Sequence, residues 1–390
     1  MIRHKFRLLL LLLLTLCGGP LCHLIAQCQV SAVTAGLRAP VKIVFSGSDH
    51  LIVTEAGNGP NTGRISVVDV TSGIRRTLVE GLPSGFSPPD NAPSGPSGIA
   101  LRGRTLYLAI GNGDVTVAGA VPGTDVPNPI PSSPIFSSVL ALHFSNYVED
   151  STAGFALTLE DHEALSERSQ LKLDNGMGDK LTIRLIADFQ DWVADPRPGE
   201  PNAVRHSNPF GLAVLDDELY LNDASMNSIR VIQLTTGDSE TLTTLPPLPN
   251  TRPFGPPLVE PVPDSIRALS SQELLVTLLS GFPFPPGQAR VLQVDRETGA
   301  AEALITGLTS AIDVLPYRSF GNEMSYLTLE FSADMLVPGT PGRLRLFSPG
   351  SSPVDLSTCL ITPTSMARDQ QSGDIYVSEI FTGRIVRVVP

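Results

Sequence analysis

The chain has 390 residues, of which 42% are apolar, so it is long enough to bury a large core. It carries 27 Lys and Arg against 39 Asp and Glu, which gives a net charge of −12. A surface of that sign repels the phosphates of nucleic acids and of anionic membranes, and this excludes nucleic acid as a partner.

Residues 1–26 are expected to be a secretory signal peptide. Basic side chains precede an unbroken apolar run, Leu8 to Leu14, and the small Ala26 comes before the polar Gln27. The run is too short for a stable membrane span, although a permanent anchor is the alternative. We therefore expect a secreted or periplasmic protein with no membrane insertion after signal removal. Removal takes away three basic residues and no acidic one, so the net charge moves from −12 to −15.

Two of the four cysteines, Cys28 and Cys359, remain after that cleavage. An exported protein meets an oxidising compartment, where these two thiols can pair. Two free thiols are the alternative.

One motif returns six times after the signal peptide: an apolar strand, most often ending in a polar or acidic residue, then a turn and a second strand. Its copies are Leu51–Glu55, Leu106–Ile110, Leu219–Asp223, Leu274–Leu278, Tyr326–Glu330 and Ile375–Glu379. The last positions of successive copies are 55, 113, 55, 52 and 49 residues apart. A repeat of that length in an all-strand chain predicts a β-propeller.

Each repeat supplies the four antiparallel strands of one blade. A strand such as Asn208–Leu212 precedes the motif, and a third such as Gly383–Val388 and an outer one such as Arg76–Val79 follow it. We predict an all-β fold, a six-bladed β-propeller over residues 27–390. The last unit lacks an outer strand, and the N-terminal segment from Gln29 to Ala35 is expected to fill that gap and close the ring.

The long interval of 113 residues is explained by an insert at about residues 145–181 in blade two, with a helical segment around Glu160 to Arg168. Val139 to Phe144 and Leu181 to Phe189 are then the strands that flank it. The alternative is a seventh blade within residues 111–206, because 113 is close to twice 55. The paired motif has no second copy there, which favours six blades.

Three stretches, Ser207–Ala213, Leu219–Ala224 and Ser280–Gly287, resemble the ScyD/ScyE family of exported propellers. The similarity extends over nearly the whole mature chain, and Gly-Phe-Pro-Phe-Pro in the third stretch is its most specific part. The family is related to NHL-repeat propellers, and the resemblance implies a fold and an exported location more than an activity. The chain differs from the family in its longer insert and in Leu278, where members commonly carry an acidic residue.

In a propeller, the starts of the inner strands and the ends of the second strands share one face, here called the top face. Oxygen-bearing side chains at these positions are candidate ligands of a metal in a central funnel: Asn208, Asp264, Asp223, Glu55, Glu330 and Glu379. Carboxylate and amide oxygens suit a hard cation, so Ca²⁺ is the candidate cofactor. The alternative is that these side chains accept backbone N–H bonds in local turns.

The placement of Asn208 and Asp264 is similar to that of metal ligands in SMP-30/gluconolactonase-like propellers, which implies a metal-dependent lactonase or esterase. Those enzymes also need a Glu at the start of the first inner strand, and Leu37 to Lys42 contains no acid. His206 could be a general base at the funnel, or a surface loop residue. The catalytic motifs of serine hydrolases, phosphate-binding loops and zinc proteases are missing from the sequence.

We therefore expect an exported, non-enzymatic binding module that holds an unknown small ligand or a protein at the top face. Proline- and aromatic-containing loops, Arg252–Pro256 and Phe282–Pro286, could form a stiff apolar rim there, or simply pack between blades. The lactonase or esterase is the alternative function.

Overall fold

The computed structural model describes residues 30–151, 154–318 and 324–390. The predicted signal peptide and Cys28 lie outside the described residues. Cys359 is disulfide-bonded. Within the described ranges, the structure contains no helix that is long and apolar enough to cross a membrane.

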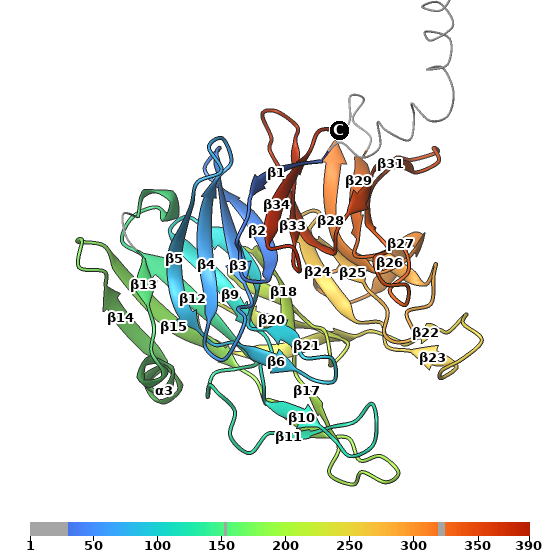
Figure 1. The fold of residues 1–390 in the computed structure, drawn as a ribbon, viewed down its shortest axis with the longest axis horizontal. Coiled ribbons are helices and arrows are strands. Elements are labelled where there is room, and N and C mark those ends of the chain that lie inside the picture. Colours follow the sequence, from blue (N-terminus) through green and yellow to red (C-terminus); the bar gives the residue numbers. More distant parts are fainter. Residues whose placement is uncertain (1–29, 152–153, 319–323) are drawn as a thin grey trace, which may run out of the picture.

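Among the described residues, six sheets share one plan, in which antiparallel strands follow one another from an inner to an outer strand (Figure 1). The first sheet contains β2 (Pro40–Ser46), β3 (His50–Glu55), β4 (Gly63–Asp69) and β5 (Arg75–Leu82). The second contains β8 (Pro96–Arg102), β9 (Thr105–Ile110), β12 (Ser138–Phe144) and β15 (Lys180–Asp188). The third contains β18 (Pro209–Leu215), β19 (Glu218–Asp223), β20 (Ser228–Gln233) and β21 (Ser239–Thr244).

The remaining three sheets follow the same plan. The fourth contains β24 (Pro263–Ala268), β25 (Glu273–Leu278), β26 (Ala289–Asp295) and β27 (Ala301–Leu308). The fifth contains β28 (Ala311–Arg318), β29 (Met324–Glu330), β30 (Gly342–Phe347) and β31 (Val354–Leu360). The sixth contains β32 (Pro363–Arg368), β33 (Ile375–Glu379), β34 (Arg384–Val388) and, as its outer strand, β1 (Val30–Thr34).

The inner strands adjoin one another in a closed ring: β2 contacts β8, then β18, β24, β28 and β32 follow in turn, and β32 contacts β2. The N-terminal strand β1 pairs antiparallel with β34, and the two strands lie side by side in Figure 1. The all-β propeller with an N-terminal strand in its last sheet is confirmed.

The segment between β12 and β15 lies against the outer strands of the first two sheets. It contains a 3₁₀ turn, η1 (Val148–Asp150), then β13 (Phe155–Ala156), which pairs parallel with β5. Helix α3 (Leu159–Arg168) begins at a capping box in which Thr158 and Asp161 each accept a backbone N–H from the other residue. After it, β14 (Gln170–Asp174) adds a fifth strand beside β15.

Residues 111–206 also form a separate small sheet, with the order β10 (Thr116–Ala118), β11 (Asp125–Pro127), β17 (Val204–His206) and β16 (Trp192–Ala194). It projects from the lower edge of Figure 1 and has no place in the ring, because the inner strands β8 and β18 are direct neighbours. Two short hairpins lie toward the same end: β6 (Gly85–Ser87) with β7 (Ala92–Ser94), and β22 (Leu248–Pro249) with β23 (Leu258–Val259).

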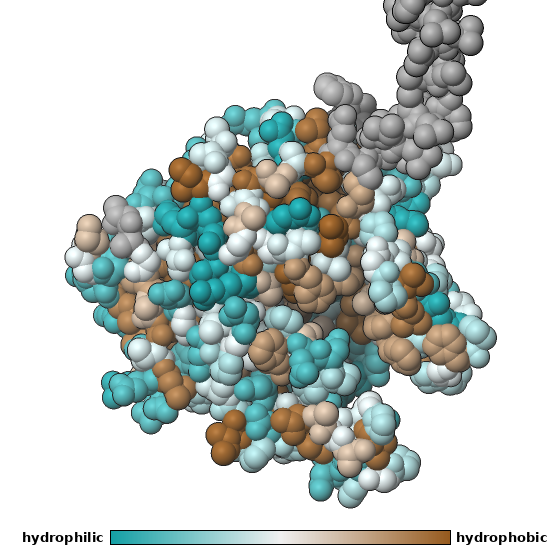
Figure 2. Space-filling model, viewed as in Figure 1, coloured by the Kyte–Doolittle hydropathy of each residue, from teal (hydrophilic) through white to brown (hydrophobic). Residues whose placement is uncertain are grey.

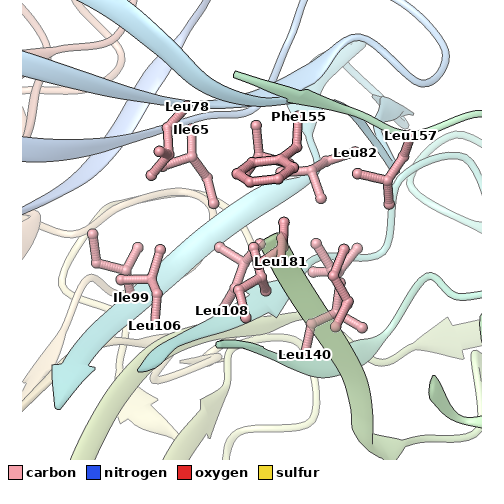
Figure 3. Close-up of a cluster of buried hydrophobic side chains, with 14 of the residues drawn as sticks. Ile65, Leu78, Leu82, Ile99, Leu106, Leu108, Leu140, Phe155, Leu157 and Leu181 are labelled. Carbon is pink, nitrogen blue, oxygen red and sulfur yellow. The ribbon is translucent and has the colours of Figure 1, made fainter. Parts of the chain in front are cut away.

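The core lies between the faces of neighbouring sheets. In the close-up, Ile65, Leu78 and Phe155 face Ile99 and Leu108 of the next sheet (Figure 3). Both faces of such strands are covered, which explains why the repeated motif is an apolar run and not an alternating one. Burying a large aliphatic or aromatic side chain contributes about 1.5–3 kcal/mol, so these interfaces are the main source of stability.

Near the axis the neighbouring inner strands approach so closely that only glycine fits at two positions. A Cβ atom on Gly98 would lie 2.4 Å from the carbonyl oxygen of Phe210. A Cβ atom on Gly211 would lie 2.4 Å from the carbonyl oxygen of Asp264. A side chain at either position would have to push the two neighbouring strands apart.

Candidate functional site

A cavity of about 360 Å³ opens at the end of the ring where β6 and β7 lie, and we call it the funnel. The second residue of every inner strand contributes to its wall: Val41, Ser97, Phe210, Asp264, Ile312 and Thr364. Loop residues such as Leu279, Phe331 and Phe381 extend the wall outward. The funnel is therefore mainly apolar, with a few polar groups.

The starts of the inner strands explain why these side chains converge. Five of the six strands begin with Pro, and in each strand the pairing register shifts just after the first residue. Such a bulge bends the strand and re-aims the side chain that follows. Four of the residues just before these strands adopt a left-handed backbone with positive φ: Ala39, Val262, Ser310 and Thr362.

The floor of the funnel is closed by a buried ion pair between Lys42 and Asp264. The distance between Lys42 Nζ and Asp264 Oδ1 is 2.7 Å, and the two side chains are 7% and 5% exposed. The ammonium also donates to the carbonyl oxygens of Ile312 and Thr364, at 3.4 and 3.3 Å. It lies 4.9 Å from the centroid of the Phe210 ring, in cation–π contact.

A second ion pair joins the half-buried Arg267 to the buried Asp313. Arg267 Nη2 is 2.7 Å from Asp313 Oδ2, and the hydroxyls of Ser265 and Ser365 also donate to this carboxylate. Burial opposes the charge of Asp313, but Arg267 and Lys42 outweigh it and hold the pKa at about 2. Burial raises the pKa of Asp264 to about 6, although Lys42 acts in the opposite direction.

Asn208 and Asp264 both line the funnel. The backbone N–H of Asn208 donates to Asp223 Oδ1 at 2.8 Å, while its side-chain amide makes no hydrogen bond within the described part of the chain. Asp264 Oδ2 likewise accepts no hydrogen bond from the described residues. These two groups can therefore contact a ligand.

The other four predicted ligands, Glu55, Asp223, Glu330 and Glu379, are buried and do not line the funnel. Each accepts a backbone N–H from the loop that precedes its own sheet. Each also faces an arginine of the third strand, and Arg64 binds Glu55 through two hydrogen bonds, of 2.8 and 2.5 Å. The structure thus brings two of the six predicted side chains together and places the other four in separate contacts within their sheets.

Asp264 is paired with Lys42, and the metal site expected from the sequence stays a prediction. Within residues 30–151, 154–318 and 324–390, no group of three or more His, Cys, Asp or Glu could hold a metal ion. The ammonium of Lys42 already lies at contact distance from Asp264, where it would repel a divalent cation. Sequence reasoning missed this role of Lys42, since the strand-start bulge that aims it inward leaves no periodic signal.

His206 lies outside the funnel, in a second cavity of about 320 Å³ that we call the side pocket. Its Nδ1 atom is 3.3 Å from Asp125 Oδ2 of the small projecting sheet. His206 is therefore neither in the funnel nor an isolated surface residue.

The predicted rim loops lie close together. Arg252 Nε donates to the carbonyl oxygen of Pro283 at 3.0 Å, and Arg252 Nη2 is 2.6 Å from Asp334 Oδ1. Phe282 and Phe254 are 61% and 48% exposed, and Figure 2 shows brown, apolar side chains on the projection that carries β22 and β23. The loops are thus both tied together and partly apolar at the surface.

No family model and no curated protein matches the chain. An auxiliary nutrient binding protein from Bacteroides thetaiotaomicron is similar in structure, with a TM-score of 0.52 at 10% identity, covering 92% of this chain and 75% of that one. Streptogramin B lyase gives a TM-score of 0.48 at 13% identity, with 92% and 96% covered. A putative oxidoreductase (glucose dehydrogenase) from Thermus thermophilus gives 0.48 at 15% identity, with 92% and 99% covered.

At 10% identity, the likeness to the auxiliary nutrient binding protein shows the fold alone. The ScyD/ScyE resemblance is not confirmed by it and stays a prediction. The chain is a β-propeller with a funnel at one end of its ring.

Proposed function

We propose that this chain is an exported binding protein whose funnel holds a compact, largely apolar molecule without transforming it. The observation that carries the proposal is the funnel itself, a cavity to which every inner strand contributes a side chain and whose lining is mainly apolar. Its volume of about 360 Å³ falls within the range of small-molecule sites. Such sites combine apolar walls with a small number of polar groups that orient the ligand.

The polar groups of the funnel are few and fixed. Lys42 and Asp264 neutralise each other at the floor, so the site attracts neither anionic nor cationic ligands strongly. Asp264 Oδ2 can accept a hydrogen bond, and the amide of Asn208 can donate and accept. A neutral molecule that presents a hydroxyl or N–H group to the floor fits these groups.

A metal-dependent lactonase or esterase is the competing function, because Asn208 and Asp264 do share the funnel. Two observations argue against it. Lys42 supplies the positive charge that Asp264 needs, and the four second-strand acids are committed to arginines and backbone N–H groups.

The first experiment is calorimetric titration of the mature protein with small neutral probes: indole, phenol and cyclohexanol. We expect saturable binding that is lost in Ala92→Trp, which places a large ring in the funnel wall on β7. The matched control is Ile74→Trp, on an exposed turn outside the funnel, which should bind as the parent does. If no probe binds, or if Ala92→Trp binds equally well, the proposal is wrong.

A second titration distinguishes the binding protein from the metal-dependent hydrolase. The metal-stripped protein and the Asn208→Ala, Asp264→Ala double variant are titrated with Ca²⁺, and each is assayed on lactones and small esters. We expect no saturable Ca²⁺ binding that depends on these two residues. Binding that the double variant loses, together with Ca²⁺-dependent turnover, would favour the hydrolase instead.

A further inference from the structure

The side pocket opens directly beside the funnel, since Asn208, Ala224 and Val262 belong to the walls of both cavities. Its outer wall is formed by β17 and neighbouring residues of the small projecting sheet, and its inner wall by loops of the third and fourth sheets. The two cavities have similar volumes, about 320 and 360 Å³. A ligand that fills one can therefore extend into the other past Asn208.

The side pocket is lined by charged side chains that lie in pairs, whereas the lining of the funnel is mainly apolar. Arg197 Nη2 lies 2.5 Å from Asp195 Oδ2, and Arg205 Nη2 lies 2.6 Å from Glu260 Oε2. The third pair is His206 with Asp125. Both arginines are thus paired with acids, so an anion finds no unopposed positive charge there, while Asp125 and His206 add hydrogen-bonding atoms.

The same pairs leave a dense set of hydrogen-bonding atoms at the pocket wall. Arg205 Nε donates to the carbonyl oxygen of Ser225 at 2.5 Å, and Asn227 donates to Glu260, so these side chains are held in place. His206 Nε2 makes no hydrogen bond within the described part of the chain. Guanidinium groups supply fixed donors and carboxylates supply acceptors, and a hydroxyl group can satisfy both at once.

We infer that the ligand has two parts: an apolar part in the funnel and a neutral, hydroxyl-rich part, of the glycosyl class, in the side pocket. Asn208, at the junction, can hydrogen-bond the linkage between them. The inference rests on the proposed function, since the apolar part is the ligand proposed for the funnel.

The test compares probes that carry one part or both. Phenol carries the apolar part, the methyl glycosides of glucose, galactose and mannose carry the polar part, and the phenyl glycosides of the same sugars carry both. We expect at least one phenyl glycoside to bind about tenfold more tightly than phenol and than its own methyl glycoside. Binding is measured by calorimetry and by the fluorescence of Trp192, the one tryptophan of the sequence, which pairs with His206 on the adjacent strand.

Two variants assign the gain to the side pocket. Arg205→Met and the more exposed Arg197→Met should each lower the preference for the phenyl glycoside by several-fold and leave the affinity for phenol unchanged. Because the Arg197 side chain is 55% exposed, its variant is expected to fold even if Arg205→Met does not. Lys180→Met is the matched control, since Lys180 is exposed and lines neither cavity.

The outcomes separate this inference from the proposed function. Phenol binding with no phenyl glycoside preferred overturns the two-part ligand and leaves the funnel proposal standing. If both arginine variants keep the preference for the phenyl glycoside, the two-part ligand is also overturned, because the sugar then binds outside the side pocket. If neither phenol nor any glycoside binds, the funnel proposal fails and this inference fails with it.

Discussion

Replacing Arg64 by Met tests whether the acid that ends a second strand holds its sheet together. Glu55 is fully buried, and its carboxylate accepts two hydrogen bonds from Arg64, one from the backbone of Arg38 and one from Ser66. Arg64→Met leaves this carboxylate in the core without a counter-charge. Breaking a buried ion pair in this way costs about 3–5 kcal/mol.

The assay is urea unfolding at pH 7, followed by circular dichroism. We expect Arg64→Met to lower the free energy of unfolding by about 3–5 kcal/mol, and the double variant Glu55→Gln, Arg64→Met to recover about 2 kcal/mol or more, because it removes both charges. Arg184→Met, at an exposed strand position, should stay within about 0.5 kcal/mol of the parent. A loss below about 1 kcal/mol, or a double variant no better than the single one, would refute the reasoning.

Three further predictions concern the funnel and its rim. A carboxyl group whose pKa is raised to about 6 in the folded protein destabilises it as the pH rises from about 4 to about 6. Between these pH values, the free energy of unfolding of the parent should therefore fall by about 3 kcal/mol relative to that of Asp264→Asn, measured by urea unfolding. The same dependence on pH in both proteins would contradict this. Gly211→Ala should destabilise by about 1–3 kcal/mol in the same assay, since its Cβ atom meets a backbone oxygen, and a neutral result would show that the strands can separate. Arg252→Ala should speed proteolysis of the rim loops at unchanged global stability, whereas unchanged cleavage would mean that its contacts do not hold them.

The fold could be predicted from the sequence because a repeat of buried strands leaves a strong signal. The runs that end at Glu55 and Glu379 each contain three consecutive buried apolar residues, Leu51–Val53 and Ile375–Val377. The last repeat supplies only three strands, so the position of the N-terminal strand as the fourth, outer strand could also be predicted. The small sheet made by β10, β11, β16 and β17 could not be foreseen in the same way, because its short strands carry no periodic pattern.

The candidate site was only partly predictable. Asn208 and Asp264 reach the funnel, as their place at strand starts indicates. The spacing of the acids could not show whether a carboxylate faces the channel or turns toward its own sheet. A signal for the second case was present, since an arginine follows Glu55 and Glu379 at the start of the next strand, as Arg64 and Arg384.

The pairing of β1 with β34 makes one sheet depend on both ends of the described chain. During synthesis β1 emerges long before β34 and stays without this partner until β34 has been made. Contacts between such distant segments are slow to form, since a long loop has to close before they contribute. Until then the edges of β1 and β34 are open to strands of other copies. The time that these two strands take to pair is therefore the time during which a new molecule is at risk of misassembly.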